Sequence, residues 1–245
     1  MINPKKRKEQ RIIIITFISI FMIAFVGLVV SLLVSGTSNN IQAQNAKKVT
    51  DSRQENRNLQ EEIKKVNETY KEAKAWLKVP GTSIDSAVYQ STDNDRYLRN
   101  DKDNVQTRWG ENFIDYRCNL DNITNPMQNY IIYGHNTEID TRFTPLLEYK
   151  DKTFFDDHQI IELATLNGYY RFQVFAAYQT TTDFYYIDTN FKDAKDFESF
   201  VNSLKEKSTY DNNVEVTSED TILTLSTCDY SIENGRFVVH AKLLK

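Results

Sequence analysis

Thr221-Ile-Leu-Thr-Leu-Ser-Thr-Cys228 is an apolar run that ends in a cysteine and is followed by the polar Asp229-Tyr-Ser. Its β-branched and aliphatic residues favour a buried strand, and the polar residues behind it favour a turn. Cys228 is therefore expected at the end of a strand, where site residues often lie. A lone cysteine is more often an inert small hydrophobe, so its neighbours decide how it is interpreted.

Further runs of the same texture lie on both sides of this segment, separated by polar turns. They are Ser86–Gln90, Asn112–Tyr116, Tyr130–Tyr133, Gln159–Ala164, Tyr170–Tyr178 and Arg236–Leu244. Seven or more strands predict a mainly β domain, either a barrel or a sandwich. Residues 192–207 interrupt this pattern with Phe197, Val201 and Leu204 at helical spacing, which predicts a helix inserted before the cysteine strand.

Two residues have the chemistry to activate the Cys228 thiol. A thiol attacks as its thiolate, which an imidazolium or a guanidinium stabilises. His135 closes the apolar strand Tyr130-Ile-Ile-Tyr-Gly134, and Arg236 opens the last strand eight residues after the cysteine. We expect His158 in a solvated turn and His240 on a face of the last strand, so His135 is the candidate partner.

The first 50 residues predict a cellular location rather than a catalytic function. Residues 12–34 form an uncharged apolar run, long enough at about 1.5 Å per residue to cross a bilayer as a helix. Residues 1–11 are basic, which predicts a cytoplasmic tail, a single-pass location in the cell membrane and an extracellular remainder. Residues 35–50 are interpreted as a tether.

Residues 51–79 are rich in Glu, Lys and Gln and contain no Gly or Pro. Apolar residues recur there at steps of three and four, which predicts an amphipathic helical segment packed on the following domain, residues 80–245. The stripe consists of Leu59, Ile63, Val66, Tyr70, Ala73 and Leu77.

Composition excludes several classes of protein. A net charge of −4 with no basic cluster after the N-terminal tail argues against a nucleic-acid partner. Two cysteines, Cys118 and Cys228, leave open one bridge, two inert thiols, or one reactive thiol beside a bystander. Their segments and those of the three histidines are far apart, so neither a metal site nor a cofactor is expected.

Three segments together resemble the signatures of the sortase family across residues 70–245. They are Trp76-Leu-Lys-Val-Pro-Gly-Thr-Ser-Ile-Asp85, Tyr130-Ile-Ile-Tyr-Gly-His-Asn136, and Thr224-Leu-Ser-Thr-Cys-Asp229 with the downstream Arg236-Phe-Val-Val. Asn-Phe-Ile-Asp-Tyr at 112–116 and the inserted helix are similar to class B. The resemblance implies an eight-stranded β-barrel with N-terminal helices and a helix before the cysteine strand.

The resemblance also implies an activity and its residues. Sortases of class B cleave a sorting signal of the Asn-Pro-x-Thr-Asn type after Thr and join the Thr carbonyl to an amine of a peptidoglycan precursor of the lipid II type. Cys228 would be the nucleophile, His135 the acid and base, and Arg236 the cationic stabiliser. The substrate groove would include Asn94, Leu98, Thr182, Tyr186, Ile187 and Ser226, and Asp229 would orient Arg236 or the imidazole.

Two other functions fit the same residues less well. A Cys-His peptidase would use the same three side chains but let water resolve the acyl-enzyme. A non-catalytic surface module would bind through the Tyr- and Phe-rich barrel and could carry a Cys118–Cys228 bridge. Within the family, pilin polymerisation is an alternative to cell-wall anchoring.

Overall fold

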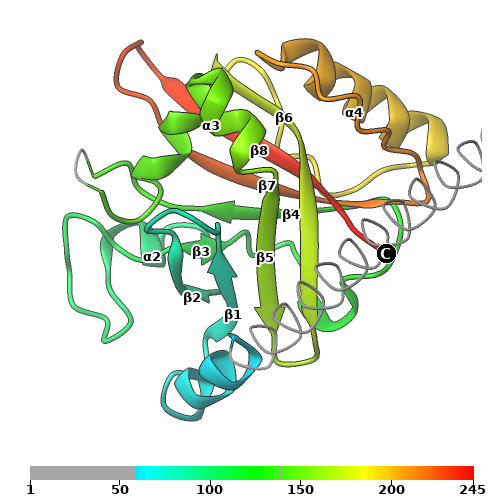
Figure 1. The fold of residues 1–245 in the computed structure, drawn as a ribbon. Coiled ribbons are helices and arrows are strands. Elements are labelled where there is room, and N and C mark those ends of the chain that lie inside the picture. Colours follow the sequence, from blue (N-terminus) through cyan, green and yellow to red (C-terminus); the bar gives the residue numbers. More distant parts are fainter. Residues whose placement is uncertain (1–58, 138–139) are drawn as a thin grey trace, which may run out of the picture. The chain divides into compact units, whose positions relative to one another are not determined.

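The computed structural model describes residues 59–137 and 140–245. Within them, eight strands close into a barrel in the order β1-β2-β3-β4-β7-β8-β6-β5 (Figure 1). The strands are β1 Ala73–Lys78, β2 Asp85–Tyr89, β3 Phe113–Ile114, β4 Gln128–Tyr133, β5 Ile160–Thr165, β6 Tyr169–Thr181, β7 Thr221–Cys228 and β8 Gly235–Leu243. The predicted mainly β, eight-stranded barrel is confirmed.

Strand pairing brings the candidate residues to one edge of the barrel. β4 and β7 are parallel neighbours, with Tyr133 opposite Ser226, so the loops that follow both strands leave at the same end. β8 returns antiparallel to β7 and begins at that end. The segment after β4, the end of β7 and the start of β8 therefore meet.

β7 is apolar throughout because both of its faces are covered. Leu223 and Leu225 belong to the core inside the barrel, whereas Ile222 belongs to a second core with Phe197 and Val201. The latter two lie on α4, Ala194–Lys207, which confirms the predicted helix before the cysteine strand. A strand covered on both sides reads as a continuous apolar run rather than an alternating one.

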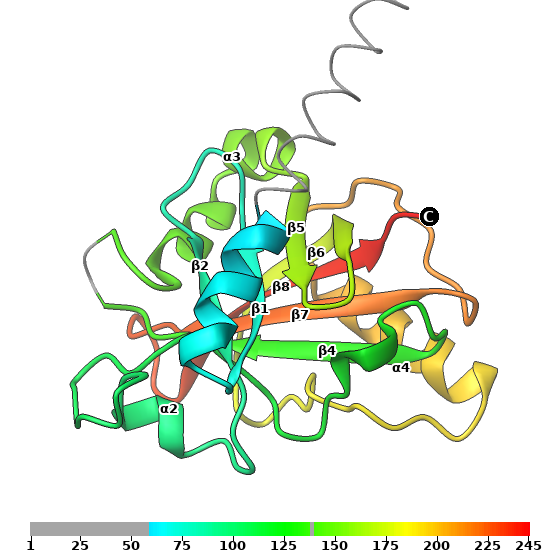
Figure 2. The same cartoon turned by 90° about the horizontal axis from the view of Figure 1, so that it is seen from below.

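Shorter helices complete the described part. They are α2 Arg96–Arg99, α3 Lys152–Asp157, and the 3-10 helices Leu120–Asn122 and Thr144–Lys150. Residues 59–69 are helical and bury Leu59 and Ile63 against Tyr89 and Tyr97. Figures 1 and 2 together show this cyan helix and α3 at opposite ends of the barrel.

The predicted helical segment 51–79 is wrong at its C-terminal end. The helix stops at residue 69, and residues 73–78 form β1, hydrogen-bonded to β2 and β5. Its burial alternates, with Ala73, Ala75 and Leu77 inside. A spacing of four residues is shared by a helix face and a strand face, so Ala73 and Leu77 fitted both periods.

The expected single-pass location in the cell membrane is corrected here. No helix among the described residues is long and apolar enough to cross a bilayer. The segments read as a basic tail (1–11), a membrane span (12–34) and a tether (35–50) lie outside the described residues, as does the start of the helical segment.

Candidate active site

Cys228 is the last residue of β7, and its half-buried thiol is free. The antiparallel register places it directly opposite Arg236 of β8. Side chains directly opposite each other in an antiparallel pair share one face, with Cβ atoms about 4.5–5.5 Å apart. The eight-residue spacing seen in the sequence therefore sets the guanidinium on the same face as the thiol.

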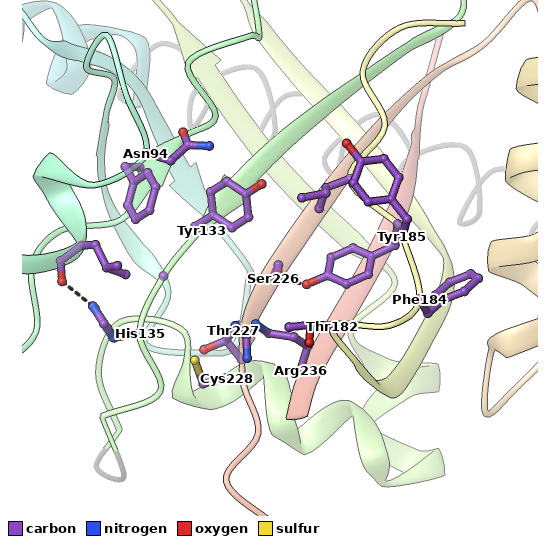
Figure 3. Close-up of a pocket in the computed structure, with 15 residues that line it drawn as sticks. Asn94, Tyr133, His135, Thr182, Phe184, Tyr185, Ser226, Thr227, Cys228 and Arg236 are labelled. Atoms are coloured by element: carbon purple, nitrogen blue, oxygen red, sulfur yellow. Dashed lines mark hydrogen bonds between the residues drawn. The ribbon is translucent and has the colours of Figure 1, made fainter. Parts of the chain in front are cut away.

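His135 reaches this site from the end of β4. The Gly134 amide donates to the Ser226 carbonyl at 3.2 Å, which holds the residue before the histidine against β7. His135 Nε2 lies 2.7 Å from the Leu98 carbonyl oxygen, the dashed bond in Figure 3. A carbonyl oxygen can only accept, so Nε2 carries the proton and Nδ1 is the ring nitrogen left for chemistry.

Gly134 is required by the space around it. A Cβ at this position would lie 2.5 Å from both Asn112 Oδ1 and Phe143 Cγ. Real Cβ atoms do not approach other atoms so closely, so a larger residue would displace the strand end. The Gly-His pair of the sequence thus reflects close packing directly before the histidine.

A cavity of about 410 Å³ opens at Cys228, His135 and Arg236. Figure 3 shows Cys228 between His135 and Arg236, with Asn94 on one side of the cavity and Phe184 and Tyr185 on the other. The sequence-predicted groove residues that line it are Asn94, Leu98, Thr182, Tyr186, Ile187 and Ser226. Together with Cys228, His135 and Arg236, these six residues make nine of the ten candidate residues that line one cavity.

Tyr186 and Ser226 form one polar contact inside this largely apolar cavity. Tyr186 Oη and Ser226 Oγ are 2.8 Å apart, and both residues are buried. Burial raises the pKa of Tyr186, so its hydroxyl stays protonated and one of the two hydroxyls donates to the other. The contact joins the connection before α4 to β7 two residues before the thiol.

Asp229 is the candidate residue that the structure does not bring to the cavity. Its buried carboxylate accepts from Lys150 Nζ at 2.6 Å, Gln179 Nε2 at 2.6 Å and Ser231 Oγ at 2.7 Å. The expectation that it orients Arg236 or the imidazole is therefore wrong. Strand alternation is the physical reason, because the residue after Cys228 projects to the opposite face.

Sequence reasoning missed several residues that line the cavity. Phe113, Tyr133, Phe184 and Tyr185 form much of its wall, and Thr227 contributes a buried hydroxyl without a hydrogen-bond partner. The sequence did offer a signal for two of them, because Tyr133 directly precedes Gly134 and Thr227 directly precedes Cys228. Nothing in a single sequence distinguishes the other aromatics from core residues.

An ion pair between the buried Asp115 and the exposed Arg117 supports the cavity wall and was also missed. Asp115 is fully buried and receives Arg117 in a bidentate pair, Nε to Oδ1 and Nη2 to Oδ2, both at 2.8 Å. Its Oδ2 also accepts from Tyr133 Oη at 2.9 Å and Asn94 Nδ2 at 3.0 Å. Burial opposes ionisation, but Arg117, Tyr133 and Asn94 outweigh it and lower the pKa of Asp115.

Cys118 has no part in this site. It is a free, buried thiol whose sulfur accepts from the Ile131 amide inside the barrel. Burial raises its pKa to about 12, which keeps it protonated and unreactive at neutral pH. The alternative of a Cys118–Cys228 bridge is thereby contradicted, and with it the main support for a non-catalytic module.

Comparison with known proteins agrees with this geometry. The family model of the sortase domain matches residues 77–244. The chain is 38% identical over 191 residues to Sortase B of Listeria monocytogenes, covering 77% of this chain and 76% of that protein. It is 39% identical over 187 residues to Sortase B of Staphylococcus aureus, covering 76% and 74%.

Solved structures give the same result. A Staphylococcus aureus sortase B–substrate complex superposes with a TM-score of 0.71 at 36% identity, covering 81% of this chain and 91% of that chain. A mutant form of Clostridium perfringens sortase B superposes with a TM-score of 0.70 at 31% identity, covering 74% and 86%. From its fold and its sequence alike, the chain belongs to the sortase family, in class B, and is a cysteine transpeptidase.

Proposed function

We propose that this transpeptidase cleaves a sorting signal of the Asn-Pro-x-Thr-Asn type after Thr and transfers the Thr acyl group to an amine of a cell-wall precursor. The observation that carries the proposal is the meeting of Cys228, His135 and Arg236 at one cavity. The clients would be surface proteins that carry the signal. A relative of known structure was solved in complex with its substrate, which supports a peptide in the corresponding cavity here.

In the first half-reaction, the Cys228 thiolate attacks the Thr carbonyl carbon. A C–S bond forms, the scissile C–N bond breaks, and imidazolium Nδ1 of His135 gives its proton to the leaving amine. The Leu98 carbonyl keeps Nε2 protonated and so leaves Nδ1 for this transfer. Arg236, opposite Cys228, supplies positive charge where the oxyanion develops or holds the peptide backbone.

The apolar cavity would accept the residues that precede the scissile bond. Asn94, Leu98, Thr182 and Ile187 line it beside the Tyr186–Ser226 contact. Peptide binding in such a cavity rests on apolar burial with a few placed polar groups. Asp229 is left out of this role because its carboxylate is bonded to Lys150, Gln179 and Ser231.

A transpeptidase differs from a Cys-His peptidase only in the second half-reaction. An amine resolves the thioester to an amide in a transpeptidase, whereas water resolves it to an acid in a peptidase. The same thiol and imidazole serve both, so the ratio of the two products is the discriminating quantity. The relatives are all named as sortases, which favours the amine.

The test is cleavage of quenched fluorescent peptides by the full-length protein, with and without an added amine. Peptides with Asn-Pro-Gln-Thr-Asn and Leu-Pro-x-Thr-Gly cores are run side by side. We expect the first to be preferred, the amine to divert product to the amide, and Cys228→Ala to lower the rate at least about 10³-fold. Cys118→Ala is the matched control and should retain the rate.

Three outcomes would contradict the proposal, in whole or in part. Cleavage that survives Cys228→Ala would remove the thiol from the mechanism. Product that stays an acid at saturating amine would make the protein a peptidase in practice. Preference for the Leu-Pro core would keep the reaction and reject the proposed signal.

A further inference from the structure

A second cavity of about 480 Å³ adjoins the first at the thiol. The two share Leu98, His135, Cys228 and Arg236 in their linings. Its own walls come from Arg99, Arg108, Trp109 and Tyr230. The reacting sulfur is therefore reached from two cavities whose remaining linings differ in character.

The second cavity is strongly cationic. It is lined by three arginines, including Arg236, and by no carboxylate. Arg99 and Arg108 are exposed and form no ion pair within the described part of the chain. By contrast, other arginines of this domain do pair, Arg96 with Glu72 and Arg142 with Glu111. Unpaired guanidinium groups beside a reacting thiol are suited to an anionic ligand.

The exposed Arg108 side chain is oriented by stacking on an aromatic ring. Its guanidinium lies over the Trp109 ring, with Cζ 4.3 Å from the centroid. That ring in turn approaches the imidazole of His135 edge to face, at 6.4 Å between centroids. Stacking orients a guanidinium while leaving its in-plane N–H donors available. Arg108 thus presents hydrogen-bond donors one aromatic ring away from the proposed acid and base.

Tyr230 fixes the opposite wall of this cavity. It lies in the turn between β7 and β8, and its hydroxyl donates to the Asn136 carbonyl at 3.1 Å. Asn136 follows His135 directly. The contact therefore links the turn after Cys228 to the segment that carries the imidazole, so the cavity is built from elements that are bonded to each other.

This inference rests on the proposed function. Once the Thr acyl group is bound to Cys228, its peptide fills the apolar cavity, and the acceptor has to approach the thioester from elsewhere. We infer that the acceptor enters through the Arg99–Arg108–Trp109–Tyr230 cavity and is an amine that also carries a carboxylate, recognised by Arg99 and Arg108.

The charges suit both ends of such an acceptor. A carboxylate is attracted by Arg99 and Arg108, whereas the nearby positive charges disfavour an ammonium and favour the neutral, nucleophilic amine. In the step itself, the amine nitrogen forms a C–N bond to the acyl carbon as the C–S bond breaks. His135 takes the N–H proton and returns it to the Cys228 sulfur, so atoms and charges balance.

The test measures amide and acid products from one sorting peptide with matched acceptors. Diglycine and triglycine are compared with their C-terminal amides, which differ only in the carboxylate. We expect the free acids to give about three- to tenfold higher kcat/KM for amide formation at low salt, and less at high salt. Arg99→Gln with Arg108→Gln should abolish the preference, and Arg108→Glu should reverse it. Lys195→Gln, on α4 away from both cavities, is the control.

The outcomes separate this inference from the proposed function. Equal use of acids and amides by the unmodified protein, or a preference that survives the double substitution, would overturn the inference while transpeptidation stands. Failure to cleave the sorting peptide or to form any amide would overturn the proposed function itself. The charge reversal remains informative because Arg108 is exposed and its loss removes no buried contact.

Discussion

At the scale of single residues, the Asp229 carboxylate, next to Cys228 in the sequence, stabilises the structure around the site rather than taking part in the reaction. Asp229 accepts from Lys150, at the end of a 3-10 helix, and from Gln179 of β6. It therefore ties two elements to the residue after Cys228. Burial opposes its ionisation, but the bonds from Lys150, Ser231 and Gln179 outweigh burial and lower the pKa of Asp229 to about 2.

This depressed pKa predicts a pH-dependent contribution to folding. Asp229→Asn should lower the free energy of unfolding at pH 7 by about 1–2 kcal/mol, discounted because Lys150 is partly exposed. The contribution is fully present above the unfolded pKa of 3.8 and is lost as the pH falls through about 2. Chemical denaturation of both proteins between pH 7 and 2 measures it. A difference that stays constant over this range would show that the charge is not responsible.

At the scale of elements, the Asp115–Arg117 pair connects three segments around the peptide cavity. Asp115 holds Tyr133 of β4 and Asn94, while Arg117 Nη2 donates to the Ile187 carbonyl at 3.0 Å and Nη1 to Tyr185 Oη at 3.3 Å. The segment 182–187 follows the end of β6 at Thr181 and contains no helix or strand to hold it in place. The guanidinium thus substitutes for the strand hydrogen bonds that this wall lacks.

This link predicts a positioning role for Arg117. Arg117→Gln should raise KM for the sorting peptide by about tenfold and change kcat by less than about threefold, because the cavity wall moves while the thiol and imidazole stay. Arg117→Lys should rescue part of the loss by keeping the charge. Arg171→Gln, in β6 and outside both cavities, is the control. An unchanged KM alongside reduced stability would mean that the pair only supports the fold.

Some of these elements could be predicted from the sequence and others could not. β7 and α4 were predictable because a long apolar run and a clear helical stripe each admit one interpretation. β1 was not, since Ala73 and Leu77 continue the spacing of the preceding helix while Ala75, between them, is small and weakly informative. Only pairing with β2 and β5, which comes from distant segments, makes residues 73–78 a strand.

At the scale of the whole molecule, the barrel decides which cysteine reacts. His135 lies 93 residues before Cys228, and Arg236 lies eight residues after it. The parallel pairing of β4 with β7 brings His135 to the thiol, and the antiparallel pairing of β7 with β8 brings Arg236 there. The same closure buries Cys118 behind Ile131. Motifs in the sequence could nominate the three residues, but the aromatic wall and the Arg99–Arg108–Trp109–Tyr230 cavity depend on contacts that no local pattern contains.

The measurement that tests the central claim most directly is the mass of the full-length protein during turnover. A sorting peptide without added amine should load one acyl group, and fragmentation should map it to Cys228. Hydroxylamine should then remove it, because thioesters are cleaved by this nucleophile. An acyl group found on Cys118 or on any other residue, or none in a protein that cleaves the peptide, would contradict the thioester mechanism.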